Sequence, residues 1–169
     1  MSRIVLNATE QRLAQYVGRC RAQVNRAGGV RDQQCSHRMT GEEVDVEGAG
    51  AEIALAKLLN VYPDLSLEPR KGGADLLWGV LRVDVKTTRY PQGQLLATMY
   101  KTRGGVDVYA LLVGPFPTYE LKGFCSEAQL FDVARITDLG RGPTRAVPQA
   151  DLVTLPVRDQ RLALDTDAG

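Results

Sequence analysis

Two aspartates and a lysine within residues 72–88 have side chains that suit metal-dependent hydrolysis. Asp75 and Asp84 are separated by eight residues, and Lys86 follows Asp84 by two positions. Two carboxylates held close together repel each other unless a cation offsets their charge. Mg²⁺ takes oxygen ligands, commonly one or two carboxylates together with substrate phosphates. We therefore expect a Mg²⁺ site at Asp75 and Asp84, where the Lys86 ammonium would orient a water molecule or offset phosphate charge.

The segment that carries these residues has the pattern of a β-hairpin. Residues 80–88 alternate apolar and polar side chains, which predicts a strand with Asp84 and its lysine neighbour on one face and an anchoring apolar face on the other. Residues 74–78 predict a preceding strand, and Gly79 a tight turn between the two. This hairpin would bring Asp75 to the level of Asp84.

The rest of the chain alternates helical and extended patterns, which predicts one α/β domain (1–169) with a mixed sheet. Apolar residues recur with helical spacing in two long segments, and Glu52 lies within the second of these. The expected helices are residues 8–26 with Thr9 as the N-cap, 48–60, and 126–134 with Ser126 as the N-cap. The expected strands are residues 65–69, 74–78, 80–88, 106–114 (central and buried) and 119–124. Residues 30–46 are expected to form a loop, 90–103 give no clear pattern, and the tail from Thr137 is expected to run over the surface, with an extended piece at 152–155.

Composition and charge exclude several classes of protein. The chain has 169 residues, 44% hydrophobic and 24% charged, as in a soluble globular domain. Its net charge of +1 gives no diffuse attraction to nucleic acid, so any DNA contact needs a local patch. Neither a signal peptide nor a long apolar run is evident, which predicts an intracellular, cytoplasmic protein with no membrane partner. The sequence lacks a phosphate-binding GxxxxGK[ST] motif, so no nucleoside triphosphate is expected, and its three cysteines and single histidine argue against zinc and iron–sulfur sites.

These residues resemble the motif of the PD-(D/E)xK nuclease superfamily. Glu52 lies in the expected core helix, Asp75 in GGAD, and Asp84 and Lys86 in the strand DVKTT, which the apolar strand and the helix after Ser126 follow in the family's order. The resemblance covers residues 47–135, so residues 1–46 would be an N-terminal extension and 136–169 a C-terminal tail. It implies a restriction-endonuclease-like fold, a mixed sheet flanked by helices. Two departures are that Ala74 replaces the proline of the motif and that the gap between the aspartates is short.

The resemblance also implies an activity and roles for individual residues. The chain would be a Mg²⁺-dependent deoxyribonuclease, in which Mn²⁺ substitutes and endonuclease activity is favoured over exonuclease activity. Asp75, Asp84 and the Val85 carbonyl would be metal ligands, Glu52 an auxiliary acid acting directly or through water, and Lys86 the group that positions the attacking water. The compact size suggests an enzyme of a phage or mobile element.

DNA contacts are expected from polar and basic residues that flank the site: Arg70, Lys71, Arg82, Thr88, Arg89, Lys101 and Arg103. A generic charged surface explains any single one of these equally well. Tyr90 and Trp78 are expected in the core or its rim, rather than stacked on bases. The arginines of the first helix, with Arg31 and Arg38, form either an arm over DNA or part of a homodimer contact, and the sequence leaves this choice open.

Other interpretations of the acidic residues remain open. Asp84 and Lys86 can be a surface ion pair on a half-exposed strand, Asp75 a turn cap, and Glu52 a solvated charge on an amphipathic helix. The alternative functions are a catalytically inactive DNA-binding or protein-interaction domain on the same fold, and an unrelated interaction domain.

Overall fold

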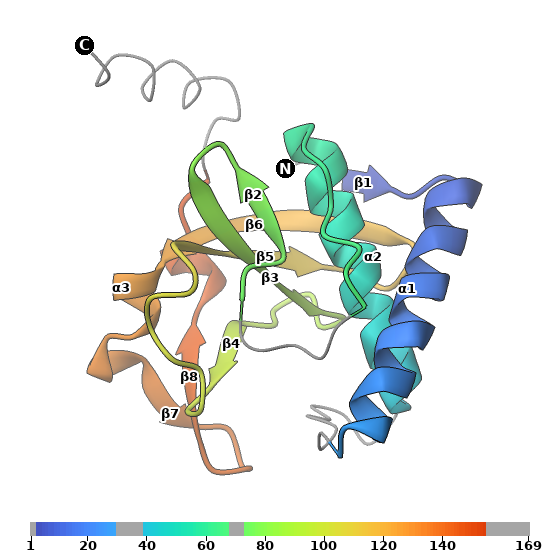
Figure 1. Ribbon diagram of the computed structural model, residues 1–169. Coiled ribbons are helices and arrows are strands. Elements are labelled where there is room, and N and C mark those ends of the chain that lie inside the picture. Colours follow the sequence, from blue (N-terminus) through green and yellow to red (C-terminus); the bar gives the residue numbers. More distant parts are fainter. Residues whose placement is uncertain (1–2, 30–38, 68–72, 155–169) are drawn as a thin grey trace.

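The computed structural model describes residues 3–29, 39–67 and 73–154 (Figure 1). The helices are α1 (Ala8–Ala27), α2 (Gly41–Leu59) and α3 (Glu127–Leu130), followed by 3₁₀ turns at Val133–Arg135 and Gln149–Asp151. The strands are β1 (Arg3–Val5), β2 (Leu76–Trp78), β3 (Leu81–Thr88), β4 (Leu95–Thr98), β5 (Val108–Val113), β6 (Thr118–Ser126), β7 (Ile136–Asp138) and β8 (Pro143–Val147).

The described strands form two sheets. The larger sheet has the order β1-β6-β5-β3-β2, with β3 and β5 parallel and all other neighbours antiparallel. The smaller sheet, β4-β8-β7, is antiparallel. The prediction of an α/β fold with a mixed sheet is therefore confirmed, and the apolar segment 106–114 contains the central strand β5. Helices α1 and α2 lie side by side along the larger sheet (Figure 1).

Both faces of the larger sheet are covered. Alternate side chains of β3 and β5 point to opposite faces. The residues on one face pack under α2 in a helix-side core: Val83, Val85, Ala110 and Leu112. The residues on the other face pack against β4 and β8 in a second core: Tyr109, Leu111 and Val113. β3 is thus an inner strand, held between a helical layer and a small sheet.

The predicted hairpin is confirmed. β2 and β3 are antiparallel neighbours with Leu76 opposite Val83 and Trp78 opposite Leu81. Gly79 has a φ of 61°, the left-handed conformation that a tight turn requires and that glycine adopts at little cost. The strand expected at residues 65–69 is not present at 65–67, and residues 68 and 69 lie outside the described ranges.

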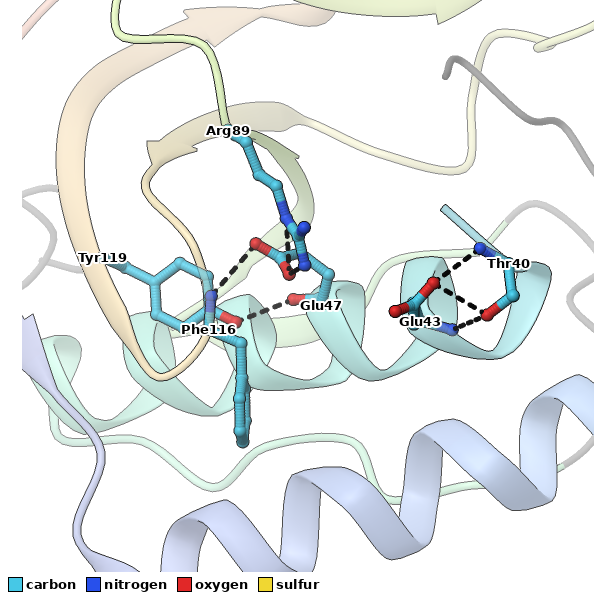
Figure 2. Close-up of polar contacts among 6 residues, drawn as sticks. All are labelled: Thr40, Glu43, Glu47, Arg89, Phe116 and Tyr119. Carbon is cyan, nitrogen blue, oxygen red and sulfur yellow. Dashed lines mark hydrogen bonds and ion pairs between the residues drawn. The ribbon is translucent and has the colours of Figure 1, made fainter. Parts of the chain in front are cut away.

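Helices α1 and α2 begin at residues different from those that the sequence predicted. The N-cap of α1 is Asn7 and not Thr9, because the Asn7 side chain accepts the Thr9 and Glu10 amides while Glu10 bonds back to the Asn7 amide. α2 begins at Gly41, so residues 41–46 are helical and not loop. Thr40 and Glu43 form the reciprocal capping box that starts it (Figure 2). The sequence signal, a threonine followed three residues later by a glutamate, was present.

The helix–helix contact depends on a glycine. A Cβ atom added at Gly18 of α1 would lie 2.5 Å from the Val46 Cα of α2, so only glycine allows this approach. α1 ends at Ala27, and Gly28 is its C-cap. Ser126 caps α3 as predicted, although α3 ends at Leu130 and the remainder of the expected helix contains a 3₁₀ turn.

The prediction for the C-terminal tail was wrong for residues 136–147, whereas the extended piece expected at 152–155 is present at Val153, which forms an antiparallel bridge with Phe124. Residues 136–147 form the β7–β8 hairpin, and β8 pairs with β4, which lies in the segment 90–103 that gave no clear pattern. Val147 and Leu95 are both fully buried in the second core. The short strand β1 was also missed, and it extends the larger sheet beside β6. The β4–β8 and β1–β6 pairs join segments far apart in the chain, and local periodicity carries little information about such pairing.

Candidate functional site

The Asp84 carboxylate lies buried between two ammonium groups. The Lys86 Nζ contacts one carboxylate oxygen, Oδ1, and the Lys101 Nζ lies 2.5 Å from the other, Oδ2. The Asp84 side chain is 3% exposed, the Lys101 side chain 14% and the Lys86 side chain 28%. The interpretation of Asp84 and Lys86 as a surface ion pair is therefore wrong, since the carboxylate is enclosed in the protein.

The electrostatics of this cluster follow from burial and the two lysines. Burial alone would raise the pKa of Asp84, but the positive charges of Lys86 and Lys101 and their hydrogen bonds outweigh it and hold that pKa below its ordinary value. Asp84 is therefore ionised at neutral pH, and with its two lysines it forms a charge triad of Lys86, Asp84 and Lys101.

Tyr109 forms the apolar side of this triad. It is opposite Asp84 on the parallel neighbour β5, and the Lys101 Nζ lies 5.7 Å from the centre of its ring, over the face. The Tyr109 hydroxyl is buried and has no hydrogen-bond partner within the described residues. Burial first, and then the nearby Asp84 charge, raise the pKa of Tyr109 well above its ordinary value, so the hydroxyl keeps its proton.

Asp75 lies just before β2 and bonds to β3. The paired β2–β3 register begins with Leu76 opposite Val83. The Asp75 amide donates to the Val83 carbonyl at 2.8 Å, and Asp75 Oδ2 accepts the Val85 amide at 2.7 Å. The N–H and C=O of an extended residue point to the same side, so the Val85 carbonyl also faces the β2 side. Asp75 is 9% exposed, and its side chain bonds to β3.

Glu52 is fixed on the helical side of the protein. Its Oε2 accepts from the Arg21 Nη1 at 2.7 Å, and both side chains are more than nine-tenths buried. Arg21 also donates to the backbone carbonyls of Asp64 and Ser66, at 2.9 and 3.1 Å. Glu52 is therefore not a solvated charge, and Arg21 is not part of an exposed arm. The Asp64 amide in turn donates to the Asp75 carbonyl at 3.3 Å, which connects this ion pair to the hairpin.

A second buried glutamate, Glu47, was missed by the sequence interpretation. It lies on α2, and its carboxylate accepts from the Arg89 guanidinium at 2.8 and 3.2 Å and from the Phe116 amide at 3.1 Å (Figure 2). The Tyr119 hydroxyl donates to the Glu47 backbone carbonyl at 3.0 Å. The contacts tie the residue that follows β3 to α2 and to the β5–β6 turn. The Arg89 side chain remains 44% exposed.

The residues predicted to contact DNA have different surroundings. Arg70 and Lys71 lie outside the described residues, and Lys101 belongs to the charge triad. Arg82 forms an exposed ion pair with Asp107. The hydrogen bonds from Arg82 lower the pKa of Asp107 to about 2. Thr88 is half-buried at the end of β3, and Arg103 lies over the Phe131 ring at 5.2 Å.

The predictions for the two aromatic residues near the site had different outcomes. Trp78 is buried in the helix-side core and stacks on Phe124 with ring centres 6.0 Å apart, as expected. Tyr90, expected in the core or its rim, is 64% exposed and therefore does not lie in the core. It follows Arg89 in the turn beyond β3, where the Thr88 hydroxyl accepts its amide.

The fold and the site thus define an α/β protein in which a buried carboxylate on the inner strand β3 contacts two lysines, with a second buried carboxylate, Asp75, bonded to the same strand. Residues 1–163 match a family described as a family of unknown function (DUF5843), and the chain belongs to that family. No curated protein and no solved structure matches the chain. Among the described residues, no helix is long and apolar enough to cross a membrane, and no three His, Cys, Asp or Glu side chains are grouped as a metal site would need.

Proposed function

We propose that this chain is a Mg²⁺-dependent nuclease with a restriction-endonuclease-like fold that hydrolyses phosphodiester bonds in DNA. One observation carries the proposal: the buried Asp84 carboxylate on the inner strand β3 contacts Lys86 and Lys101, and Asp75 bonds to the same strand at Val83 and Val85. A buried acidic cluster of this kind costs folding free energy, and a site for cations and phosphates explains why the chain keeps it. Such an enzyme would act on DNA in the cytoplasm.

The residues present fit a hard divalent cation. Asp75, Asp84 and the Val85 carbonyl are oxygen donors, the type that Mg²⁺ and Mn²⁺ prefer. Only two carboxylates take part in this set, so substrate phosphate and water would complete it. Glu52 is the auxiliary acid of the proposal, and its carboxylate is oriented by Arg21.

The protein's own residues would position the substrate and the water. When bound, Mg²⁺ would polarise the scissile phosphate and lower the pKa of the attacking water. Lys86 would hold that water and offset the charge that develops on the phosphate. Arg89 would contact the DNA backbone, because Glu47 fixes its guanidinium at the end of β3 while leaving part of the side chain exposed.

One observation favours a second candidate, an inactive DNA-binding or interaction domain on the same fold. The two lysines already neutralise Asp84 without a metal ion. If the triad were purely structural, the chain would bind DNA or a protein through its surface and would not cleave. Cleavage and metal binding separate the two candidates.

Cleavage assays test the proposal directly. Linear, circular, single-stranded and branched DNA would be incubated with the purified protein in Mg²⁺, in Mn²⁺ and in EDTA. We expect cleavage with either cation and none in EDTA, and cut circular DNA would identify an endonuclease. Asp84→Asn should lower the rate by at least about a hundredfold, because it removes a proposed metal ligand. Glu120→Gln, a carboxylate-to-amide change on β6, is the matched control.

The result that contradicts the proposal is equally clear. If Asp84→Asn retains its fold by circular dichroism and cleaves as fast as the wild type, Asp84 is not part of the reaction. DNA binding without cleavage in either cation would favour the inactive domain.

A further inference from the structure

The two lysines of the charge triad reach Asp84 from different parts of the fold. Lys86 is two residues away on the same strand and the same face of β3. Lys101 comes from the turn after β4, in which its amide donates to the Thr98 carbonyl at 3.2 Å. Lys101 therefore belongs to the small-sheet side of the protein, and its contact with Asp84 joins that side to the central hairpin.

Each Asp84 oxygen contacts an ammonium group, so a metal ligated by Asp84 meets positive charge on both sides. Like charges in a largely buried site repel strongly, because little water screens them. Lys86 has 28% of its side chain exposed and can share its charge with water, whereas Lys101 has 14% exposed. Water therefore screens the repulsion between a bound cation and Lys101 less than it screens the repulsion between that cation and Lys86.

We propose that Lys101 is a built-in competitor for the divalent cation at Asp84, neutralising this carboxylate before the cation binds and leaving it when the cation arrives. The proposal rests on the proposed metal site. Tyr109 offers Lys101 a second place: its ring face already lies under the ammonium, and its buried hydroxyl lacks a partner among the described residues. A lysine ammonium can donate to a phenolic oxygen, so Lys101 can leave Asp84 without losing every partner.

Calorimetric titration with Mn²⁺ alone tests this competition. Lys101→Met removes the competing charge and keeps most of the side-chain volume, so Mn²⁺ should bind at least about tenfold more tightly than to the wild type. Lys101→Arg keeps the charge and should bind like the wild type. Lys122→Met is the matched control: Lys122 is paired with Glu120 at 2.8 Å and is similarly buried, at 13% exposed, so its removal should leave Mn²⁺ affinity unchanged.

Thermal unfolding gives a second readout, which does not depend on catalysis. Without metal, Lys101→Met leaves Asp84 with one ammonium fewer and should lower the melting temperature, whereas added Mn²⁺ should raise it by more than it does in the wild type. Lys101→Gln, which keeps a hydrogen-bond donor without the charge, replaces the methionine variant if that variant does not fold.

The outcomes distinguish this inference from the proposed function. If Asp84→Asn loses Mn²⁺ binding while Lys101→Met and Lys101→Gln bind Mn²⁺ no more tightly than the wild type, the metal site stands and the competition is wrong. If Asp84→Asn binds Mn²⁺ as the wild type does, the metal site itself fails and the competition fails with it.

Discussion

Glu52 and Asp84 are both buried carboxylates, but Glu52 pairs with an arginine and Asp84 with two lysines. Glu52 accepts from Arg21, whose guanidinium also donates to two backbone carbonyls. Asp84 is held by two lysines, one of them from another layer of the fold. The rigid, multiply bonded guanidinium suits a permanent structural link, whereas a lysine ammonium on a flexible stem is a point charge that can be exchanged for another cation.

The comparison separates structural support from a site that can change its partner. The ion pair between Arg21 and Glu52 fixes the segment at Asp64, which in turn contacts the Asp75 backbone. The ammonium groups of Lys86 and Lys101 instead contact the Asp84 carboxylate from two parts of the fold. We therefore expect loss of Arg21 to affect mainly the free energy of unfolding, and changes to the triad to affect mainly metal binding and cleavage.

The largest effect on stability is expected from Arg21→Met. It removes the buried ion pair with Glu52 and two hydrogen bonds to the backbone, so the free energy of unfolding should fall by about 3–5 kcal/mol. Urea denaturation measures this change. The matched control is Arg19→Met on the same helix, because Arg19 pairs with Glu42 at the surface at 3.1 Å and its loss should cost less than about 1 kcal/mol. Equal effects of the two substitutions would refute the structural role of the buried pair.

A smaller effect is expected from acid, and it depends on Asp84. Its folded-state pKa lies below that of the unfolded chain, so the folded protein binds fewer protons and the stabilisation is present at neutral pH. This stabilisation should disappear as the pH falls below about 4, through the folded-state pKa. Asp84→Asn should therefore lose less free energy of unfolding than the wild type between pH 6 and pH 3.

An exposed carboxylate provides the control for that measurement. Asp107 also has a lowered pKa, of about 2, through its hydrogen bonds to Arg82, so Asp107→Asn should flatten the acid dependence in the same direction. Added salt should diminish the Asp107 effect more, because exposed pairs are screened and buried ones are not. If salt acts equally on both, Asp84 is not shielded in the way that its burial indicates.

The smallest effect is expected from Tyr109→Phe. The hydroxyl has no partner among the described residues, so removing it costs no hydrogen bond and should change the free energy of unfolding by less than about 1 kcal/mol, in the stabilising direction if at all. Mn²⁺ affinity should fall a few-fold, because Lys101 loses the oxygen to which it would move. A large loss of stability would mean that the hydroxyl has a partner in solution, and would weaken the argument for a displaced Lys101.

The local part of the fold was predictable from the sequence. Alternation along residues 80–88 and the glycine turn together predicted the hairpin, whereas the metal site at Asp75 and Asp84 stays a prediction. Ser126 was correctly predicted as a cap, because capping depends on a residue and its immediate neighbours. The start of α2 was missed although Thr40 and Glu43 carried the signal, because the polar segment before it obscured the helical period.

Only the tertiary structure decided the partners of the charged residues. Lys101 reaches Asp84 because β4 pairs with β8 far along the chain, and Arg21 meets Glu52 because Gly18 lets α1 approach α2. The sequence alone determined which residues alternate, turn and cap, since these properties depend on a few neighbouring bonds. It did not determine which cation meets which carboxylate, because such contacts depend on how separate elements pack, and local periodicity does not encode that packing.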